Sequence, residues 1–378
     1  MKITFYSCYM NHHQLPVALE LFNREDIEYH FVAKYPFNEE RRKLGYVDMN
    51  KSYSFIVRYY EGEKEQTKSI VLAETSDVIV HDGTFLEEEK KALEKGNLVF
   101  RYSEHVFKKE PYFYFHLKTF YKILKTHIRA KDKSEIYLLC ASAYRAVEAK
   151  LFNEYAQSYK WGYFPEFYSY EVDKLIKKKD DKCIKMLWCG RFLKWKNIDL
   201  VVPIAKYLNK KGIQFEITMI GEGEEKENIV NAVEKENLSR CIKFCSGTNY
   251  KEVRKYMEAA AIYLFLSNHE EGWGVVLNEA MNSGCAVVAN KLAGSTPYLI
   301  KNNYNGVVFH DRNVKELERK IYLLCKNRVR RENLGRNAYL SIEKLWNPKV
   351  AAENLIVLCK TLQNQGENLI KIGPGSKS

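Results

Sequence analysis

The chain has 378 residues, more than one ordinary domain holds, and 46% of them are hydrophobic, which is enough for two cores. Its nine cysteines form no Cys-x-x-Cys pair, which favours buried thiols over disulfides or zinc ligands. A net charge of +12 suits anionic partners such as nucleic acid, nucleotide sugars or acidic lipid. Since no apolar run approaches the roughly 20 residues that span a bilayer, we expect a cytoplasmic protein, free or at the inner face of the cell membrane.

The first half of the chain alternates short apolar runs with helical stretches. Strands are predicted over residues 3–8, 28–33, 77–80, 97–102 and 135–140, and helices over 15–22, 85–95, 113–129 and 144–155. Between 36 and 72 only short strand-like pieces stand out. This alternation predicts a parallel sheet with helices on both faces, and we expect one domain over residues 1–165.

A charged stretch, residues 166–182, reads as an interdomain linker, and a second alternation follows it. Strands are predicted over 184–189, 215–220, 242–244, 261–266, 286–289 and 307–309, with helices over 198–208, 225–236, 250–259, 275–282, 314–326 and 330–345. We therefore expect a second doubly wound domain over 183–345. A Trp-Asn-Pro break at 346–348 opens the last segment, 346–366, in which a helix is predicted over 350–363, and the tail 367–378 is predicted to be disordered or left from expression.

The stretch 261–284 is predicted to be a buried strand, a polar loop with glycines and a helix. Such a loop brings backbone N–H groups and the positive end of a helix dipole to one point, where a phosphate is the natural guest. Glu271 lies in the loop and Glu279 on the helix. A diphosphate would repel an adjacent carboxylate, so Glu271 makes sense only if it faces neutral hydroxyls.

A second basic segment follows the strand 184–189. Arg191 comes directly after Gly190, at the end of that strand, and Lys196 follows five residues later. Two cations at a strand end suit a diphosphate, because arginine can grip it with two hydrogen bonds and lysine acts as a point charge.

These two segments carry a resemblance to a known family. The run from Glu271 to Ala280, EGWGVVLNEA, resembles the E-x7-E segment of retaining glycosyltransferases of family 4, and the run from Gly190 to Lys196 resembles their G-R-x4-K segment. The resemblance implies a GT-B fold: two Rossmann-like domains facing a cleft, with the C-terminal helix returning to the first domain. It also implies that Arg191 and Lys196 hold the diphosphate and stabilise it as the leaving group. Glu271 would lie by the donor sugar, and Glu279 would hold the ribose. The loop residues expected at the donor are Gly272, Trp273, Gly274 and Val275.

A pair of glycines, Gly221 and Gly223, follows the strand 215–220. Lys226 stands where a dinucleotide fingerprint would have its third glycine, which disfavours a nicotinamide or flavin cofactor. Two interpretations stay open for the pair, a tight turn between strand and helix or a contact with the nucleotide.

Histidines at strand ends of the first domain are candidates for the acceptor side. His12 and His13 lie in the loop after the first strand, and Glu104 and His105 follow the strand 97–102. Family members often carry a histidine in the cleft at the end of a later strand, so the resemblance implies a catalytic role at this place, and we assign it to His105. The alternative that Glu104 takes this place stays open.

The predicted helix 113–129 carries an apolar stripe and a separate basic stripe of Lys118, Lys122, Lys125 and Arg129. A core-facing helix with a solvated basic flank is the favoured interpretation. The alternative is contact with an anionic membrane surface.

We conclude that the sequence predicts a retaining glycosyltransferase of the hexosyltransferase type. Its donor would be a UDP or GDP sugar, and its acceptor a glycan or lipid-linked sugar of a cell-surface polysaccharide. No Asp-x-Asp occurs in the chain, so we expect catalysis without a metal and without a cofactor. Two alternatives are a sugar-nucleotide epimerase on the same fold and a non-catalytic nucleic-acid-binding protein. Dispersed basic residues argue against nucleic acid as a partner.

Overall fold

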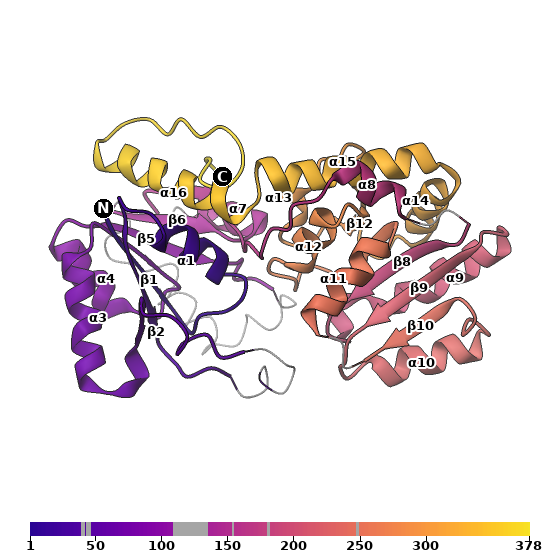
Figure 1. Cartoon of the computed structure of the whole chain (residues 1–378), viewed down its shortest axis with the longest axis horizontal. Coiled ribbons are helices and arrows are strands. Elements are labelled where there is room, and N and C mark those ends of the chain that lie inside the picture. Colours follow the sequence, from indigo (N-terminus) through magenta and orange to yellow (C-terminus); the bar gives the residue numbers. More distant parts are fainter. Residues whose placement is uncertain (39–41, 43–46, 109–134, 153–154, 180–181, 247–248) are drawn as a thin grey trace. The chain divides into compact units, whose positions relative to one another are not determined.

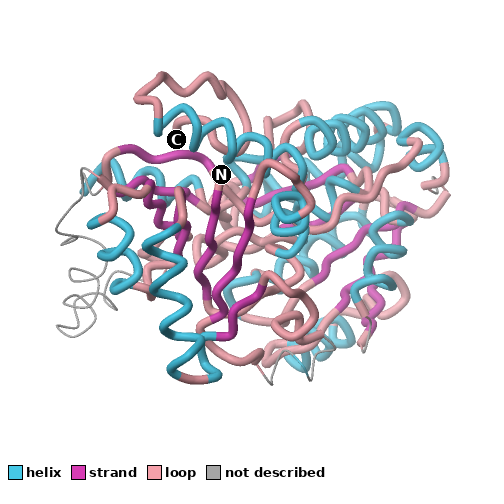
Figure 2. The backbone as a smooth tube through the Cα atoms, turned by 60° about the vertical axis from the view of Figure 1, so that its left-hand side comes forward, coloured by secondary structure: helices cyan, strands magenta, loops and turns pink. Residues whose placement is uncertain are grey.

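A computed structural model describes residues 1–38, 42, 47–108, 135–152, 155–179, 182–246 and 249–378 (Figure 1). The chain divides into two compact units: Met1–Glu166 with Leu345–Ser378, and Phe167–Lys344. Each unit is built on a parallel sheet, whose strands run side by side in Figure 2. The predicted fold class, two Rossmann-like α/β domains, is confirmed. The predicted basic helix 113–129 lies outside the described residues.

The first unit holds a seven-stranded sheet in the order β3-β2-β1-β4-β5-β6-β7. Its strands are β1 (Lys2–Ser7), β2 (Glu28–Ala33), β3 (Ile56–Arg58), β4 (Val78–His81), β5 (Leu98–Ser103), β6 (Ile136–Cys140) and β7 (Gln157–Lys160). The described helices are α1 (Leu15–Phe22), α3 (Glu63–Thr75), α4 (Leu86–Glu94), α7 (Ala143–Phe152) and α16 (Pro348–Gln363). Helix α16 packs against α1, so the predicted return of the C-terminal helix to the first domain is confirmed.

The second unit holds a six-stranded sheet in the order β10-β9-β8-β11-β12-β13. Its strands are β8 (Ile184–Cys189), β9 (Phe215–Ile220), β10 (Ile242–Cys245), β11 (Ile262–Phe265), β12 (Ala286–Asn290) and β13 (Val307–Phe309). Its helices are α8 (Val172–Lys177), α9 (Val201–Lys210), α10 (Lys226–Lys235), α11 (Tyr250–Ala259), α12 (Val276–Asn282), α13 (Thr296–Leu299), α14 (Val314–Lys326) and α15 (Arg328–Lys344). All residues of β11 and β12 are buried, as expected for continuous apolar runs in a parallel sheet covered on both faces.

The C-terminal tail is ordered, so the prediction of disorder is wrong. The backbone N–H of Lys160 donates to the carbonyl of Ser376, and the N–H of Gly375 donates to the carbonyl of Lys160, each at 2.8 Å. Ser376 is buried. The tail therefore pairs with β7 at the edge of the first sheet. The composition of the tail could not reveal this pairing, because it joins residues far apart in the sequence.

Among the described residues, helices α3, α8 and the four-residue α13 lie where the sequence suggested none. Helix α3 buries only Ser69, Leu72 and Ala73, a narrow face of mostly small residues that leaves little apolar periodicity to detect. Helix α8 lies within the stretch expected to be a linker and packs against α15 in the second unit. Among the described residues, no helix has the length and apolarity needed to cross a membrane.

Candidate functional site

The second sheet has a switch point between β8 and β11. These strands are neighbours in the sheet, but the chain runs outward from β8 to β9 and β10 before it returns to β11. In open parallel sheets, ligands bind beyond the carboxyl ends of the strands at such a point. Arg191 and Lys196 lie in the loop after β8, and Glu271 lies in the loop after β11. The topology therefore brings the two predicted donor segments to the same place.

Lys196 and Glu271 are in direct contact. The Lys196 ammonium donates a hydrogen bond to the Glu271 carboxylate and forms an ion pair with it. The side chains are only 12% and 10% exposed, so water screens the pair weakly. The two loops are also joined through their backbones, because the N–H of Asn268 donates to the carbonyl of Trp195 at 2.9 Å. Sequence reasoning selected both charged residues but did not foresee that they would pair.

Unlike Lys196, Arg191 is not part of an ion pair within the described residues. Its side chain is exposed, and within the described part of the chain no hydrogen bond or ion pair engages its guanidinium. An arginine in this state can offer its donors to an anion without first breaking an internal contact.

The loop glycines after β9 serve the packing of two loops. A Cβ on Gly221 would lie 1.9 Å from the carbonyl oxygen of Gly190, and one on Gly223 would lie 2.5 Å from that of Phe192. Both glycines have positive φ, 139° and 152°. The backbone N–H of Phe192 donates to the carbonyl of Glu222 at 2.8 Å. The tight-turn interpretation of the glycine pair therefore has a physical basis, since the loop that carries Arg191 rests directly on them.

Gly274 allows the Glu271 loop to fold on itself. Its φ is +81°, and a Cβ there would lie 2.3 Å from the Phe265 ring and 3.1 Å from the carboxyl carbon of Glu271. The backbone N–H of Gly294 donates to the carbonyl of Glu271 at 3.0 Å, which adds a tie to the loop after β12. The neighbouring Gly272 is buried. Any larger residue at position 274 would push the carboxylate aside.

Trp273 belongs to the core of the second unit rather than to an open binding surface. Its side chain is 1% exposed, and its indole N–H donates to the Asn278 side-chain oxygen at 2.9 Å. The Trp273 carbonyl accepts a hydrogen bond from the Ser295 hydroxyl at 2.5 Å. The tryptophan thus fastens the loop to α12 and to the loop after β12.

Glu279 lies in the first turn of α12. Desolvation by burial raises the pKa of its carboxyl group, and the positive charge of Arg254 acts in the opposite direction. Within the described part of the chain, no hydrogen bond engages this carboxylate. The Arg254 side chain instead donates to the Glu279 carbonyl at 3.1 Å and to the Ser283 hydroxyl at 3.0 Å. This arginine was not selected from the sequence, because nothing in its helix α11 marks it as more than a surface residue.

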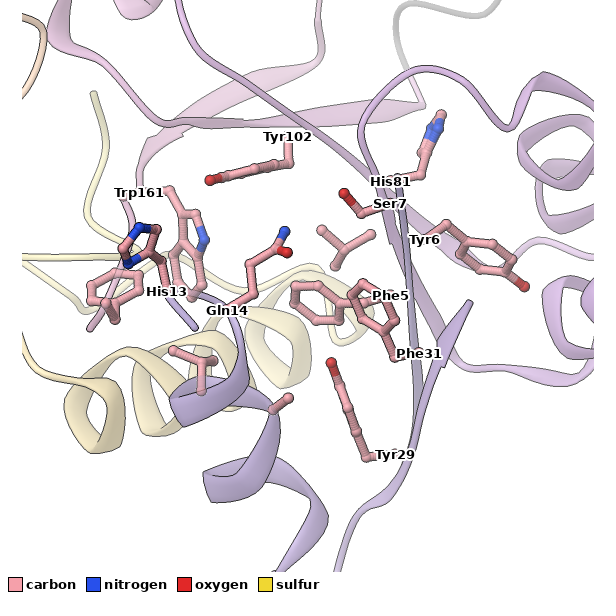
Figure 3. Close-up of a pocket in the computed structure, with 15 residues that line it drawn as sticks. Phe5, Tyr6, Ser7, His13, Gln14, Tyr29, Phe31, His81, Tyr102 and Trp161 are labelled. Atoms are coloured by element: carbon pink, nitrogen blue, oxygen red, sulfur yellow. The ribbon is translucent and has the colours of Figure 1, made fainter. Parts of the chain in front are cut away.

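The first-unit candidates lie at strand ends, as predicted. The rings of His12 and His13 are 3.6 Å apart between centroids. His13 lines a cavity of about 30 Å³, shown in Figure 3, together with Gln14, Tyr102 and Trp161. A cavity of that size holds about one water molecule rather than a sugar ring.

The other acceptor-side pair divides into a buried and a more exposed residue. His105 is 4% exposed, and its Nδ1 lies 2.9 Å from the Ser142 hydroxyl. Glu104 is partly exposed and forms an ion pair with Lys108. Ser142 escaped sequence reasoning because it lies 37 residues further along the chain, at the end of the neighbouring strand.

Comparison with known proteins points to one class. Residues 170–341 match the model of the family "Glycosyl transferases group 1". An uncharacterised glycosyltransferase of Methanocaldococcus jannaschii is 29% identical over 196 residues, 51% of this chain and 49% of that relative. Amylovoran biosynthesis glycosyltransferase AmsK of Erwinia amylovora is 24% identical over 184 residues, 47% of this chain and 45% of that relative. The chain thus spans about half the length of these relatives.

Solved structures agree on the fold along the whole chain. Anabaena HepE in complex with UDP superposes with a TM-score of 0.68 at 15% identity, covering 96% of this chain and 100% of that one. TarM superposes with a TM-score of 0.67 at 14% identity, covering 94% and 98%. The fold is that of GT-B glycosyltransferases. The family match and the relatives support a glycosyltransferase of group 1, and they favour neither the epimerase nor the nucleic-acid alternative.

Proposed function

We propose that the protein is a retaining glycosyltransferase that moves a sugar from a nucleotide diphosphate sugar to a glycan or lipid-linked acceptor. The observation that carries this proposal is the grouping of Arg191, Lys196 and Glu271 at the switch point between β8 and β11, with Glu279 on the helix that follows. The group combines two cations, which suit a diphosphate, with two carboxylates. One carboxylate suits the hydroxyls of the donor sugar and the other those of the ribose.

The roles follow from charge. When the bond between the anomeric carbon and the phosphate oxygen breaks, the bonding electrons go to the diphosphate, and Arg191 and Lys196 stabilise the new charge. Glu271 accepts hydrogen bonds from hydroxyls of the donor sugar and favours the positive charge that develops on its ring. The Glu279 carboxylate accepts hydrogen bonds from the ribose hydroxyls. With two cations in place, the donor needs no metal ion.

Relatives and neighbours narrow the substrates to test first. HepE has been crystallised with UDP and with UDP-glucose, and one relative is a poly(ribitol-phosphate) alpha-N-acetylglucosaminyltransferase of Staphylococcus aureus, 28% identical over 169 residues, 45% of this chain and 34% of that relative. We therefore propose a UDP sugar as donor, with a GDP sugar second, and a role in cell-surface polysaccharide synthesis at the cytoplasmic face of the membrane. The acceptor is assigned to the first unit, beside His12, His13 and His105.

A panel of UDP and GDP sugars in a thermal-shift assay tests the proposal, since a ligand that binds the folded state raises its melting temperature. The donor that shifts the melting temperature is then incubated with candidate glycan acceptors, and NMR gives the anomeric configuration of the product. A product with the configuration of the donor is expected. An inverted product would overturn retention, and an absence of any shift across the panel would overturn the proposed donor class.

A further inference from the structure

Asn197 immediately follows Lys196 and adopts a left-handed backbone conformation, with φ 51° and ψ 37°. It is 3% exposed. Its side-chain amide donates to the carbonyl of Leu266 at 3.1 Å and to the Asp311 carboxylate at 3.2 Å. One buried side chain thus joins the loop after β8 to the end of β11 and to the loop after β13. Leu266 directly precedes the loop that carries Glu271.

The opposite side of the Asn197 amide is also held. Its side-chain oxygen accepts a hydrogen bond from Arg312 at 3.2 Å, and Arg312 is tied to Asp199 at 2.6 Å. Both the NH2 group and the oxygen of the amide are therefore hydrogen-bonded, and these bonds fix the orientation of the Asn197 side chain.

The groups that accept from Asn197 do not need it for their own satisfaction. The Asn290 side chain donates to the same Asp311 oxygen at 2.7 Å and to the same Leu266 carbonyl at 3.3 Å. Removing the Asn197 amide would therefore leave no buried acceptor without a donor, which is the usual source of a large stability loss. The amide can instead contribute by fixing the position of Lys196, the residue before it.

We propose that Asn197 is a positioning residue for the donor site, and that its amide sets where the Lys196 ammonium stands relative to Glu271. Two features define that position: the left-handed residue Asn197 directly follows Lys196, and its amide is hydrogen-bonded to Leu266, at the end of the strand that leads to Glu271. The inference rests on the proposed contact between Lys196 and the donor diphosphate.

A double-mutant cycle with UDP as the probe tests the inference. Asn197→Gly keeps the left-handed turn, which glycine adopts without strain, and removes the buried side chain that carries the amide. We expect UDP to bind roughly five- to tenfold more weakly to Asn197→Gly than to wild type. In a Lys196→Met background the same change should have no effect, because the group that Asn197 positions is gone.

A matched control separates positioning from stability. Asn305 is also buried, and its amide donates to the Leu299 carbonyl and to the Ser341 hydroxyl, each at 2.9 Å. Asn305→Ala should lower the melting temperature at least as much as Asn197→Gly while leaving UDP affinity at the wild-type value. If Asn197→Gly does not fold, Arg312→Gln releases the amide oxygen from a largely exposed arginine, and a roughly twofold to threefold loss of UDP affinity is expected.

Equal weakening of UDP binding in the wild-type and Lys196→Met backgrounds would overturn the positioning role, as would unchanged binding by Asn197→Gly. A different result would count against the proposed function instead. If Lys196→Met alone binds UDP like wild type, the assignment of Lys196 to the diphosphate is wrong.

Discussion

Arg254 donates to the backbone carbonyl of Glu279 at 3.1 Å, and so places a positive charge beside a carboxyl group whose pKa is raised by burial. The contact is made to the main chain, and the carboxylate itself has no hydrogen bond within the described residues. A charged group in this state destabilises the folded chain by itself and becomes favourable only when a ligand supplies donors. Two hydroxyls of a ribose would do so.

Glu279→Gln should therefore raise the melting temperature at pH 7 and weaken UDP binding. Because the folded pKa lies above the ordinary 4.5, the folded state holds the proton more tightly, and stability falls as pH rises from 4.5 through the raised pKa. The advantage of the variant should shrink as the pH falls toward 4. Melting curves across pH and calorimetric titration with UDP measure both effects. The exposed Glu234→Gln should change neither, and a variant that melts below wild type at pH 7 would contradict the argument.

Arg191→Ala should lower kcat/KM by about tenfold or more, since a hydrogen bond to a charged group contributes roughly 1.5–3 kcal/mol. UDP affinity should fall as well, while the melting temperature stays the same because the side chain is exposed and has no described partner. Lys194→Ala, in the same loop and also exposed, is the control and should behave like wild type. If the Arg191 variant binds UDP with the affinity of the wild type, the diphosphate binds elsewhere.

Glu271→Gln should separate binding from turnover. It removes the carboxylate that pairs with Lys196, so the lysine becomes available to the diphosphate and UDP affinity should be equal to wild type or higher. Turnover should fall by roughly a hundredfold, because a charge that acts mainly on the transition state is lost. Calorimetry with UDP beside steady-state rates tests both parts. Loss of UDP binding here, with normal binding by Glu279→Gln, would reverse the roles of the two glutamates.

Transfer activity should survive an excess of EDTA, since we propose that Arg191 and Lys196 neutralise the diphosphate in place of a metal ion. The assay compares initial rates with and without the chelator and after addition of Mg²⁺ or Mn²⁺. Activity that disappears with EDTA and returns with either ion would show that a metal holds the donor.

The second unit was the more predictable one because its sequence signals are local. Helix α11 and strands β8 and β13 lie at the predicted residues, and the sequence motifs alone indicate Arg191, Lys196 and Glu271. Each lies in the loop that follows a strongly apolar strand, and parallel topology then brings the ends of these strands together without further information.

What escaped prediction depends on contacts between distant residues. The Lys196–Glu271 pair joins positions 75 residues apart. In the sequence Asn197 is an ordinary loop asparagine, and only the fold brings Leu266 and Asp311 within hydrogen-bonding distance of it. Lys179, part of the presumed linker, is buried and donates to the Ala260 carbonyl at 2.7 Å, where it satisfies the end of α11. Charge and polarity in the sequence suggest solvent for such residues, and only the tertiary fold supplies their partners.

The tail that pairs with β7 has a consequence for the chain in solution. An edge strand presents unpaired backbone groups that can recruit a strand from another molecule, and here the segment Gly373–Ser378 occupies part of that edge, with Lys377 bridged to Tyr159. A purification tag that pulls this segment away, or a truncation before Gly373, would expose the edge to other copies. We expect such preparations to self-associate as their concentration rises, so a tag is better placed at the other terminus.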